Sequence, residues 1–295
     1  MSNLLTGGIG FVGAGALGST MARAMHQAGY HATAVANRPN TSVDALANSI
    51  EGYEPVQAPQ AVADRCDVVF ITVPDASIEA VTESIQWRSG QAVVHCSGAS
   101  QLSVLDKAKG DHALVGAFHP LQTFGGRDVS PDVMRNIAYA VEATSPLHEE
   151  LETLATDLGG WPIALAAKDR VMYHASAIAT CGLLATLVKL SSDLWTDFNQ
   201  GGDQGLKALL PLVRSTLDGI EHRGFPNVLT GPMVRGDVAT VASHIEALSA
   251  RAPEFQQVYS HLALASLPIA KAKGGLGTNE EEQLRELLTN SLQIK

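Results

Sequence analysis

The chain has 295 residues, of which 45% are hydrophobic, and its formal net charge is −10. This length exceeds that of one typical domain, and the hydrophobic content suffices for two cores. Because nucleic-acid binding needs a basic surface, the acidic balance argues against a nucleic-acid partner. No stretch approaches a membrane span free of charges or glycine breaks, so we expect no membrane partner.

The cysteines suggest an intracellular protein. Cys66, Cys96 and Cys181 form no C-x-x-C pair and no cluster with metal-ligand spacing. Isolated thiols of this kind are typical of a reducing cytoplasm, where they pack as small apolar groups. The first apolar run has no Lys or Arg before it, which argues against a secretion signal. We therefore predict a cytoplasmic protein without a metal site.

A glycine-rich turn follows the first apolar run of the chain. The segment Ile9–Gly18 reads I-G-F-V-G-A-G-A-L-G, and a helix is expected over 19–28. In dinucleotide-binding folds, a G-x-G-x-x-G turn of this kind places backbone N–H groups and a helix N-terminus against a pyrophosphate. Glycines also mark ordinary turns, but here the strand and helix that the motif requires are both predicted. We expect Gly13 to form the tight turn, Gly15 to admit the phosphates and Gly18 to let the helix pack on the strand.

The end of the second expected strand, residues 31–36, indicates which dinucleotide is favoured. An NAD protein usually places a carboxylate there, whereas an NADP protein prefers an arginine for the 2′-phosphate. Segment 37–41 reads N-R-P-N-T and contains no acid. Asn37 can donate hydrogen bonds and Arg38 can pair with a phosphate, so the sequence favours NADP. The alternative is that Arg38 is a solvated loop charge.

Strand-like runs alternate with helical segments as far as Ala166, which is typical of a parallel sheet covered by helices. Further strands are expected over 67–73, 92–96, 112–118 and 161–165, with helices over 77–85 and 147–158. Ligands of such sheets bind beyond the carboxyl ends of the strands, so the loops there should converge. The residues expected around the cofactor are Gly13, Ala14, Gly15, Ala16, Leu17, Gly18, Asn37, Arg38, Val73, Pro74, Asp75, Ser97 and Gly98.

Strand signals disappear after Lys168. Helices are expected over 170–194, 204–222, 237–248, 253–264 and 279–292. Asp237 is a suitable N-cap for the third of these helices. We therefore predict an α/β protein with a Rossmann domain over residues 1–166, followed by an all-helical domain over residues 167–295.

Two histidines and one arginine are the candidates for chemistry. His119 is expected to begin a loop at the carboxyl edge of the sheet, where imidazole can donate or relay a proton. His174 lies four residues after Arg170, which places both on one helix face. Arg170 is suited to binding a carboxylate or phosphate. The alternatives are a histidine that bonds a loop backbone and an arginine in a helix-surface ion pair.

Several blocks of sequence resemble one group of bacterial proteins. The blocks are the Gly13 fingerprint, N-R at 37–38, V-P-D at 73–75, H-C-S-G-A at 95–99, F-H-P-L-Q-T-F at 118–124, Y-H-A at 173–175, L-T-G-P at 229–232 and R-G-D at 235–237. Together they resemble Rossmann-like oxidoreductases with a C-terminal domain of unknown function, distant relatives of 6-phosphogluconate dehydrogenase, pyrroline-5-carboxylate reductase and deazaflavin-dependent NADP reductases. The resemblance implies an NADP-linked dehydrogenase or reductase with a 6-phosphogluconate-dehydrogenase-like helical domain, which joins two chains in a homodimer.

Two positions depart from the pattern of these relatives. They often carry a lysine where Arg170 stands and an asparagine about where Gly182 stands. If that pair handles the substrate oxygen, then either His119 and His174 carry proton transfer in this chain, or the substrate differs or activity is reduced.

Three functions remain open from the sequence. The leading hypothesis is hydride transfer between NADP and a small anionic keto, hydroxy or imino compound in a cleft between the domains. A catalytically silent NADP(H)-binding sensor or regulatory protein is the alternative. Electron exchange with a deazaflavin is a third possibility, although the 5% aromatic content offers no clear stacking surface.

Overall fold

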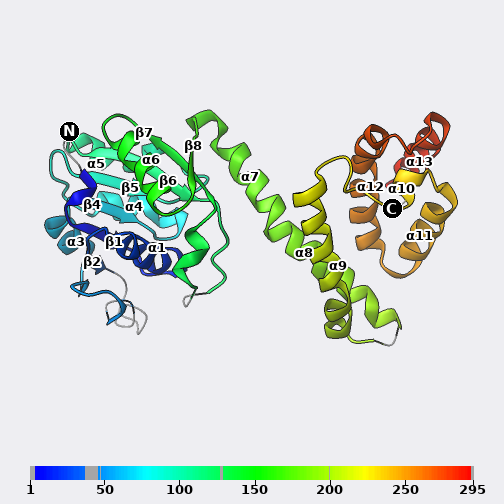
Figure 1. The fold of residues 1–295 in the computed structure, drawn as a ribbon, viewed down its shortest axis with the longest axis horizontal. Coiled ribbons are helices and arrows are strands. Elements are labelled where there is room, and N and C mark those ends of the chain that lie inside the picture. The colour runs from blue at the N-terminus through cyan, green and yellow to red at the C-terminus, as the bar shows by residue number, and fades with distance from the viewer. Residues whose placement is uncertain (1–3, 37–45, 47, 127–128, 199, 294–295) are drawn as a thin grey trace. The chain divides into compact units, whose positions relative to one another are not determined.

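A computed structural model of the chain describes residues 4–36, 46, 48–126, 129–198 and 200–293 (Figure 1). The N-terminal part is built around an eight-stranded sheet. Its strands are β1 (Ile9–Val12), β2 (Ala32–Ala36), β3 (Glu54–Val56), β4 (Val68–Ile71), β5 (Ala92–His95), β6 (Leu114–Pro120), β7 (Ala138–Ala143) and β8 (Trp161–Ala164). Their order is β3-β2-β1-β4-β5-β6-β7-β8, and only the β6–β7 pair is antiparallel. This is the strand order of a Rossmann fold, which confirms the predicted fold class.

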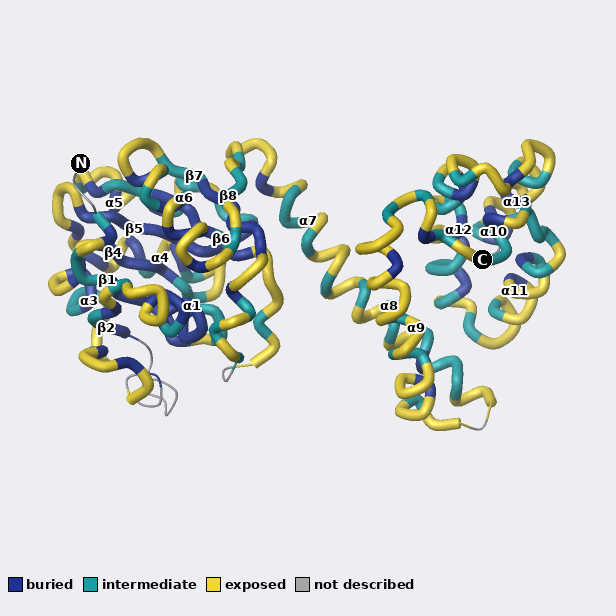
Figure 2. Tube along the Cα trace, in the orientation of Figure 1, coloured by how far each residue is buried: buried dark blue, intermediate teal, exposed yellow. Residues whose placement is uncertain are grey.

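Helices cover both faces of this sheet, because its strands are apolar on both sides. Along β4, Val68 and Phe70 belong to the core under α1 (Ala16–Gln27) and α6 (Leu147–Asp157). The alternate residues Val69 and Ile71 belong to the core under α3 (Pro59–Arg65), α4 (Ile78–Glu83) and α5 (Asp106–Gly110). Side chains of a strand alternate between faces, so the apolar run predicted over 67–73 serves both cores. Figure 2 shows the central strands as buried.

Several strand and helix boundaries differ from the expectations. The strands β3 and β7 were not expected: β3 contains Pro55, which a strand tolerates at the edge of a sheet, and β3 is an edge strand. His119 lies inside β6 rather than at the start of the following loop.

The single helix expected over 170–194 is two helices, α7 (Arg170–Thr180) and α8 (Gly182–Asp193), separated at Cys181. Gly182 therefore begins a helix instead of lying inside one.

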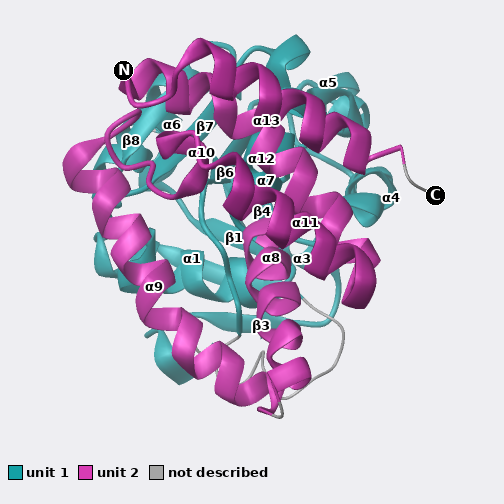
Figure 3. Cartoon of the chain, turned by 90° about the vertical axis from the view of Figure 1, so that its right-hand side faces the viewer, with its two compact units in different colours: residues 1–181 teal, residues 182–295 magenta. Residues whose placement is uncertain are grey.

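The chain divides into two compact units, residues 1–181 and 182–295, which Figure 3 colours separately. Helix α7 thus groups with the sheet, although the sheet itself ends at Ala164. The functional boundary that we expect near Ala166 stays a prediction.

The second unit is helical throughout the part that the structure describes. It comprises α8, a short 3₁₀ segment (Leu194–Phe198), α9 (Gly202–Arg223), α10 (Pro232–Arg235), α11 (Val238–Arg251), α12 (Pro253–Lys273) and α13 (Thr278–Ser291). Asp237 caps α11 as expected, since its side chain accepts a hydrogen bond from the Thr240 amide. The helix α12 continues past Pro268, beyond the expected end at 264, and the buried Leu267 and Ala270 pack into the core of this unit.

Residues 167–198 form one strongly apolar helical stretch that includes α7 and α8. By length and composition alone it could cross a membrane, contrary to the expectation that no stretch comes close. Val171, Met172 and Leu183 are 67%, 76% and 59% exposed. Length and composition do not distinguish a membrane span from a helix that another protein surface covers. The exposed apolar side chains nevertheless call for a cover of some kind.

Candidate functional site

The glycine-rich turn has the backbone geometry that its motif requires. Gly13 has φ +112°, and a Cβ there would lie 2.7 Å from backbone atoms of Thr72. A Cβ on Gly18 would collide with the carbonyl oxygen of Gly13, so Gly18 allows close packing. Nothing lies within 4 Å of the corresponding position at Gly15. Gly13 and Gly18 therefore have structural roles, whereas the space at Gly15 is open to a ligand.

The turn is fixed on both sides and leads into a helix N-terminus. The Gly13 amide donates to the Ala36 carbonyl at 2.9 Å, and Thr72 Oγ1 donates to the Gly13 carbonyl at 2.7 Å. Gly15 is the N-cap of α1, and no described side chain caps that end. Uncapped amides at a helix N-terminus favour anions, so this turn fits the phosphates of a dinucleotide.

The loops after β4 and β5 meet at the same edge of the sheet. Pro74 and Asp75 follow β4, and Asp75 Oδ2 accepts a hydrogen bond from Ser97 Oγ at 2.7 Å. Ser97 Oγ in turn accepts from the amides of Ala99 and Ser100. The structure thus brings together the predicted residues after β1, β4 and β5. Asn37 and Arg38 lie outside the described residues.

His119, Tyr173 and His174 form a contacting group, which we call the His119 cluster. His119 Nδ1 lies 2.7 Å from Tyr173 Oη, and the two rings meet edge to face with centroids 5.6 Å apart. The His119 and His174 rings are 6.2 Å apart. A Cβ on Gly98 would lie 2.6 Å from His174 Nδ1 and 2.9 Å from His119 Nε2. Both histidines therefore border Gly98, in the loop already bonded to Asp75.

Arg170 is fully buried, and its donors are directed inward. Its Nε donates to Glu142 Oε2 at 2.7 Å, and its Nη1 donates to the Ser97 carbonyl at 3.1 Å. The alternative of a helix-surface ion pair is therefore wrong. Arg170 thus has Nε and Nη1 bonded within the protein, whereas its Nη2 has no partner among the described residues. It connects α7 with β7 and with the loop that carries Gly98.

Burial keeps two histidines of this region uncharged. It lowers the pKa of His119 to about 4, an effect that the charges of His174 and Arg170 strengthen and that of Asp75 opposes. Burial, with Arg170 and His119, lowers the pKa of His95 to about 3. A neutral imidazole can still donate its ring N–H, so His119 remains suited to proton donation.

Three buried nitrogens around Ser97 and Gly98 lack a partner among the described residues. They are His95 Nε2, Arg170 Nη2 and His174 Nδ1. Buried polar atoms are normally satisfied, so these nitrogens are suited to bonding a ligand or water. A cavity of about 320 Å³ lies beside the His119 cluster. Its lining residues are His119, Leu121, Gln122, Thr123, His174, Ala177, Ile178, Thr180 and Cys181.

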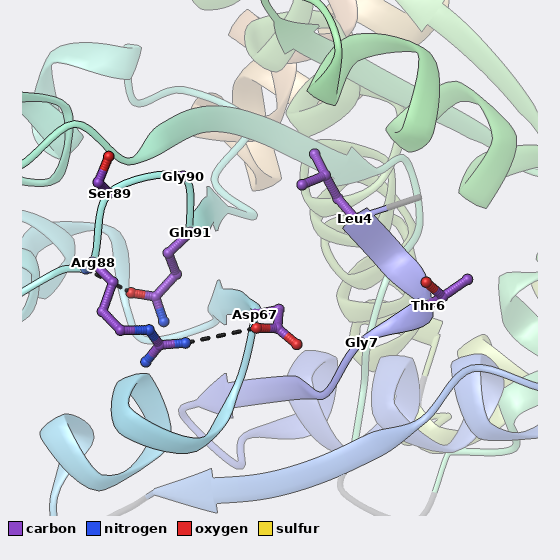
Figure 4. Close-up of a pocket in the computed structure, with 8 residues that line it drawn as sticks. All are labelled: Leu4, Thr6, Gly7, Asp67, Arg88, Ser89, Gly90 and Gln91. Carbon is purple, nitrogen blue, oxygen red and sulfur yellow. Dashed lines mark hydrogen bonds and ion pairs between the residues drawn. The ribbon is translucent and has the colours of Figure 1, made fainter. Parts of the chain in front are cut away.

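A second cavity, of about 370 Å³, lies elsewhere on the sheet unit (Figure 4). It is lined by Leu4, Thr6, Gly7, Asp67, Arg88, Ser89, Gly90 and Gln91. Asp67 and Gln91 directly precede β4 and β5, so this cavity is at the amino edge of the strands. The guanidinium of Arg88 lies 3.8 Å from Asp67 Oδ1 and donates to the Cys66 carbonyl. None of the predicted site residues borders this cavity, and ligands of such sheets bind at the opposite edge.

Three residues of the site were not proposed from the sequence: Tyr173, Glu142 and His95. Tyr173 and His95 stand in the Y-H-A and H-C-S-G-A blocks, so their neighbourhood was a usable signal. Glu142 lies on β7, the strand that the sequence pattern did not reveal.

Two family models match this chain. Residues 8–98 match the family described as NADP oxidoreductase, coenzyme F420-dependent, and residues 137–266 match a domain of unknown function, DUF2520. The N-terminal part is thus similar to an NADP oxidoreductase domain, and the part that follows it is similar to a DUF2520 domain. This confirms the family resemblance, and NADP is the cofactor of the family that matches the N-terminal domain.

Solved structures share the fold at low sequence identity. A proposed NADP oxidoreductase from Bacteroides fragilis is 23% identical, with a TM-score of 0.72 over 90% of this chain and 99% of that one. A reductive aminase from Aspergillus terreus, solved with NADPH and ethyl-5-oxohexanoate, is 15% identical, with a TM-score of 0.59 over 98% and 94%. Pyrroline carboxylate reductase from Plasmodium falciparum, solved with NADP, is 12% identical, with a TM-score of 0.58 over 96% and 98%. No curated protein matches the sequence.

Gly15→Val should abolish NADP binding and leave the free energy of unfolding near that of the wild type, because its side chain enters the open space of the turn. Gly18→Val is the matched control. Its side chain would meet the Gly13 carbonyl, so it should also destabilise the fold, by about 1–3 kcal/mol. Calorimetric titration with NADP and urea unfolding measure the two effects. Full affinity in Gly15→Val would mean that the nucleotide binds elsewhere.

Proposed function

We propose that the protein is an NADP-dependent oxidoreductase that transfers a hydride between nicotinamide and a small keto, hydroxy or imino compound. The observation that carries this proposal is the position of Gly98. Its loop is bonded through Ser97 and Asp75 to the loop after β4, and it borders both His119 and His174. A dinucleotide turn and side chains able to move protons therefore share one edge of the sheet, as reduction of a carbonyl or imine requires.

Each part of this edge has a proposed role. Gly13, Gly15 and the start of α1 would hold the phosphates, and Arg38 would pair with the 2′-phosphate. When bound, NADPH supplies a hydride. His119 donates its ring N–H to the oxygen or nitrogen that gains the electron pair, and His174 orients the same atom.

The charge of the substrate is a separate question. The expectation of an anionic substrate rested largely on Arg170, whose Nε and Nη1 are bonded to Glu142 and Ser97. Nη2 has no partner among the described residues, so Arg170 could offer an anionic group this one nitrogen, and the anionic substrate stays a prediction. The cleft between the two domains likewise stays a prediction.

The alternative of a catalytically silent NADP(H) sensor is not favoured. A sensor needs the phosphate-binding turn but has no use for a phenol and two imidazoles in contact beside it. We also propose a cytoplasmic location, since Cys66, Cys96 and Cys181 are free thiols.

NADPH oxidation against a panel of keto acids, uncharged ketones, aldehydes and imines tests the proposed function. We expect turnover with at least one class. His119→Ala should lower kcat by about 100-fold or more, since it removes the proton donor. NADPH affinity, measured by calorimetry, should be unchanged in this variant. Tight NADPH binding without turnover of any class would support the sensor instead.

We further propose that two chains pair through the apolar helices that begin at α7. Val171, Met172 and Leu183 are exposed in one chain, and two-fold pairing is the commonest cover for such a surface. This pairing is also what the sequence resemblance implied.

Sedimentation of the purified protein should give about twice the chain mass of 31.0 kDa. Leu183→Asp should give monomers, because it places a charge in the proposed interface. Leu262→Asp is the matched control, as Leu262 is 50% exposed but lies on α12, outside this stretch. A stable active monomer would refute the dimer, and recovery only with membranes would indicate a lipid cover.

A further inference from the structure

We propose that Tyr173 is a positioning residue that supplies, through His119, the proton delivered to the reacting atom of the substrate. This inference rests on the proposed function and assigns a role to a residue for which neither the sequence analysis nor the comparisons gave one. It concerns residues of α7 and β6, which belong to the same compact unit.

The contact between the two side chains joins a neutral imidazole to a protonated phenol. His119 Nδ1 and Tyr173 Oη are 2.7 Å apart. Burial raises the pKa of Tyr173 to about 12, so the phenol keeps its proton, and it lowers the pKa of His119, so the imidazole is neutral. A neutral imidazole has one accepting nitrogen and one N–H. In the arrangement proposed here, the phenol donates to Nδ1 and the ring proton is carried by Nε2.

The N–H of His119 then faces the position where a ligand can enter. Nε2 lies 2.9 Å from where a Cβ on Gly98 would stand, and His174 Nδ1 lies 2.6 Å from the same point. Both histidines also line the cavity of about 320 Å³. Glycine at position 98 thus keeps free the space into which His119 donates.

The proton movement balances without a charged imidazole. In the direction of reduction, the hydride adds to the carbonyl carbon and the π electrons move to the oxygen. The Nε2–H bond breaks as the proton passes to that oxygen, and Nδ1 takes the proton of Tyr173 Oη. The product gains one hydride and one proton, and His119 is neutral with its proton on Nδ1. The starting state returns when Nδ1 gives that proton back to the tyrosinate and Nε2 takes a proton from water. With an imine, nitrogen takes the place of oxygen.

The charges around Tyr173 and His119 favour this order of proton transfers. His174, Arg170 and Asp75 act on His119, and His95 is also coupled to it. Arg170, one helical turn before Tyr173, lowers the pKa of the phenol against the effect of burial. Its positive charge therefore stabilises the tyrosinate that forms when the proton has left.

The second compact unit contains a matched Tyr–His pair. In the second unit, His244 Nδ1 lies 2.9 Å from Tyr259 Oη, with the rings edge to face and centroids 5.8 Å apart. Removal of that hydroxyl breaks the same kind of hydrogen bond without touching the proposed site. Tyr259→Phe is therefore the control for Tyr173→Phe.

Tyr173→Phe should lower kcat for the best substrate about 100-fold, with KM and NADPH affinity close to wild type. Tyr259→Phe should leave all three unchanged. A readout independent of turnover is the NMR spectrum of isotope-labelled histidine. In the wild type, His119 should carry its proton on Nε2 with a hydrogen-bonded Nδ1, and Tyr173→Phe should remove the Nδ1 hydrogen-bond signature.

A second replacement covers the case in which Tyr173→Phe does not fold. Incorporation of 3-fluorotyrosine at position 173 keeps the shape of the ring and lowers the pKa of the phenol. Because the donor must be protonated, the alkaline limb of the kcat profile for reduction should then move to lower pH.

The outcomes separate this inference from the proposed function. If the wild type turns over and Tyr173→Phe keeps the full kcat, or if His119 carries its proton on Nδ1, the role of Tyr173 is wrong and the oxidoreductase stands. If the wild type does not oxidise NADPH with any of the substrate classes, the proposed function fails. The NMR measurement still decides whether the Tyr173–His119 hydrogen bond has the direction required here.

Discussion

The site depends on the hydrogen bonds that the buried guanidinium of Arg170 donates. This guanidinium joins α7 to β7 through Glu142 and to the loop after β5 through the Ser97 carbonyl. The same helix carries Tyr173 and His174, so these bonds set the distance of both side chains from Gly98. Removal of one partner of a buried ion pair typically costs about 3–5 kcal/mol, because the other charge stays buried. The pair therefore holds the His119 cluster and the loop beside it together.

The same charge determines the kind of acid–base chemistry that the edge can perform. Together with burial, Arg170 lowers the pKa of both His95 and His119. In the proposed mechanism, the imidazoles of the site are therefore neutral. A neutral imidazole transfers its ring proton only if another group replaces that proton. The phenol of Tyr173 is in contact with the nitrogen that must be refilled. Burial, the ion pair and the phenol thus make one consistent arrangement.

The sequence was most informative where structure is set locally. The turn from β1 to α1 could be predicted because its glycine spacing and the strand and helix beside it lie within about twenty residues. The meeting of the loops after β1, β4 and β5 could also be predicted, because the carboxyl ends of parallel strands lie at one edge of the sheet. The contacts of Arg170 could not be predicted, since Glu142 lies on the unexpected β7. The pairing of His119 with Tyr173 joins residues separated by 54 positions, and it depends on where α7 packs. Burial, which sets the pKa of His119, is likewise a property of the folded chain.

The central claim is that His119 is neutral at physiological pH because it is buried close to Arg170. An NMR titration of the His119 ring signals tests it directly, on the intact protein and without a substrate. The account predicts that His119 remains neutral until the pH falls to about 4. An unfolded chain protonates histidine near pH 6.5, so stability should also fall as the pH drops from 6.5 towards 4. Titration of His119 at its ordinary pKa of about 6.5 would contradict the account.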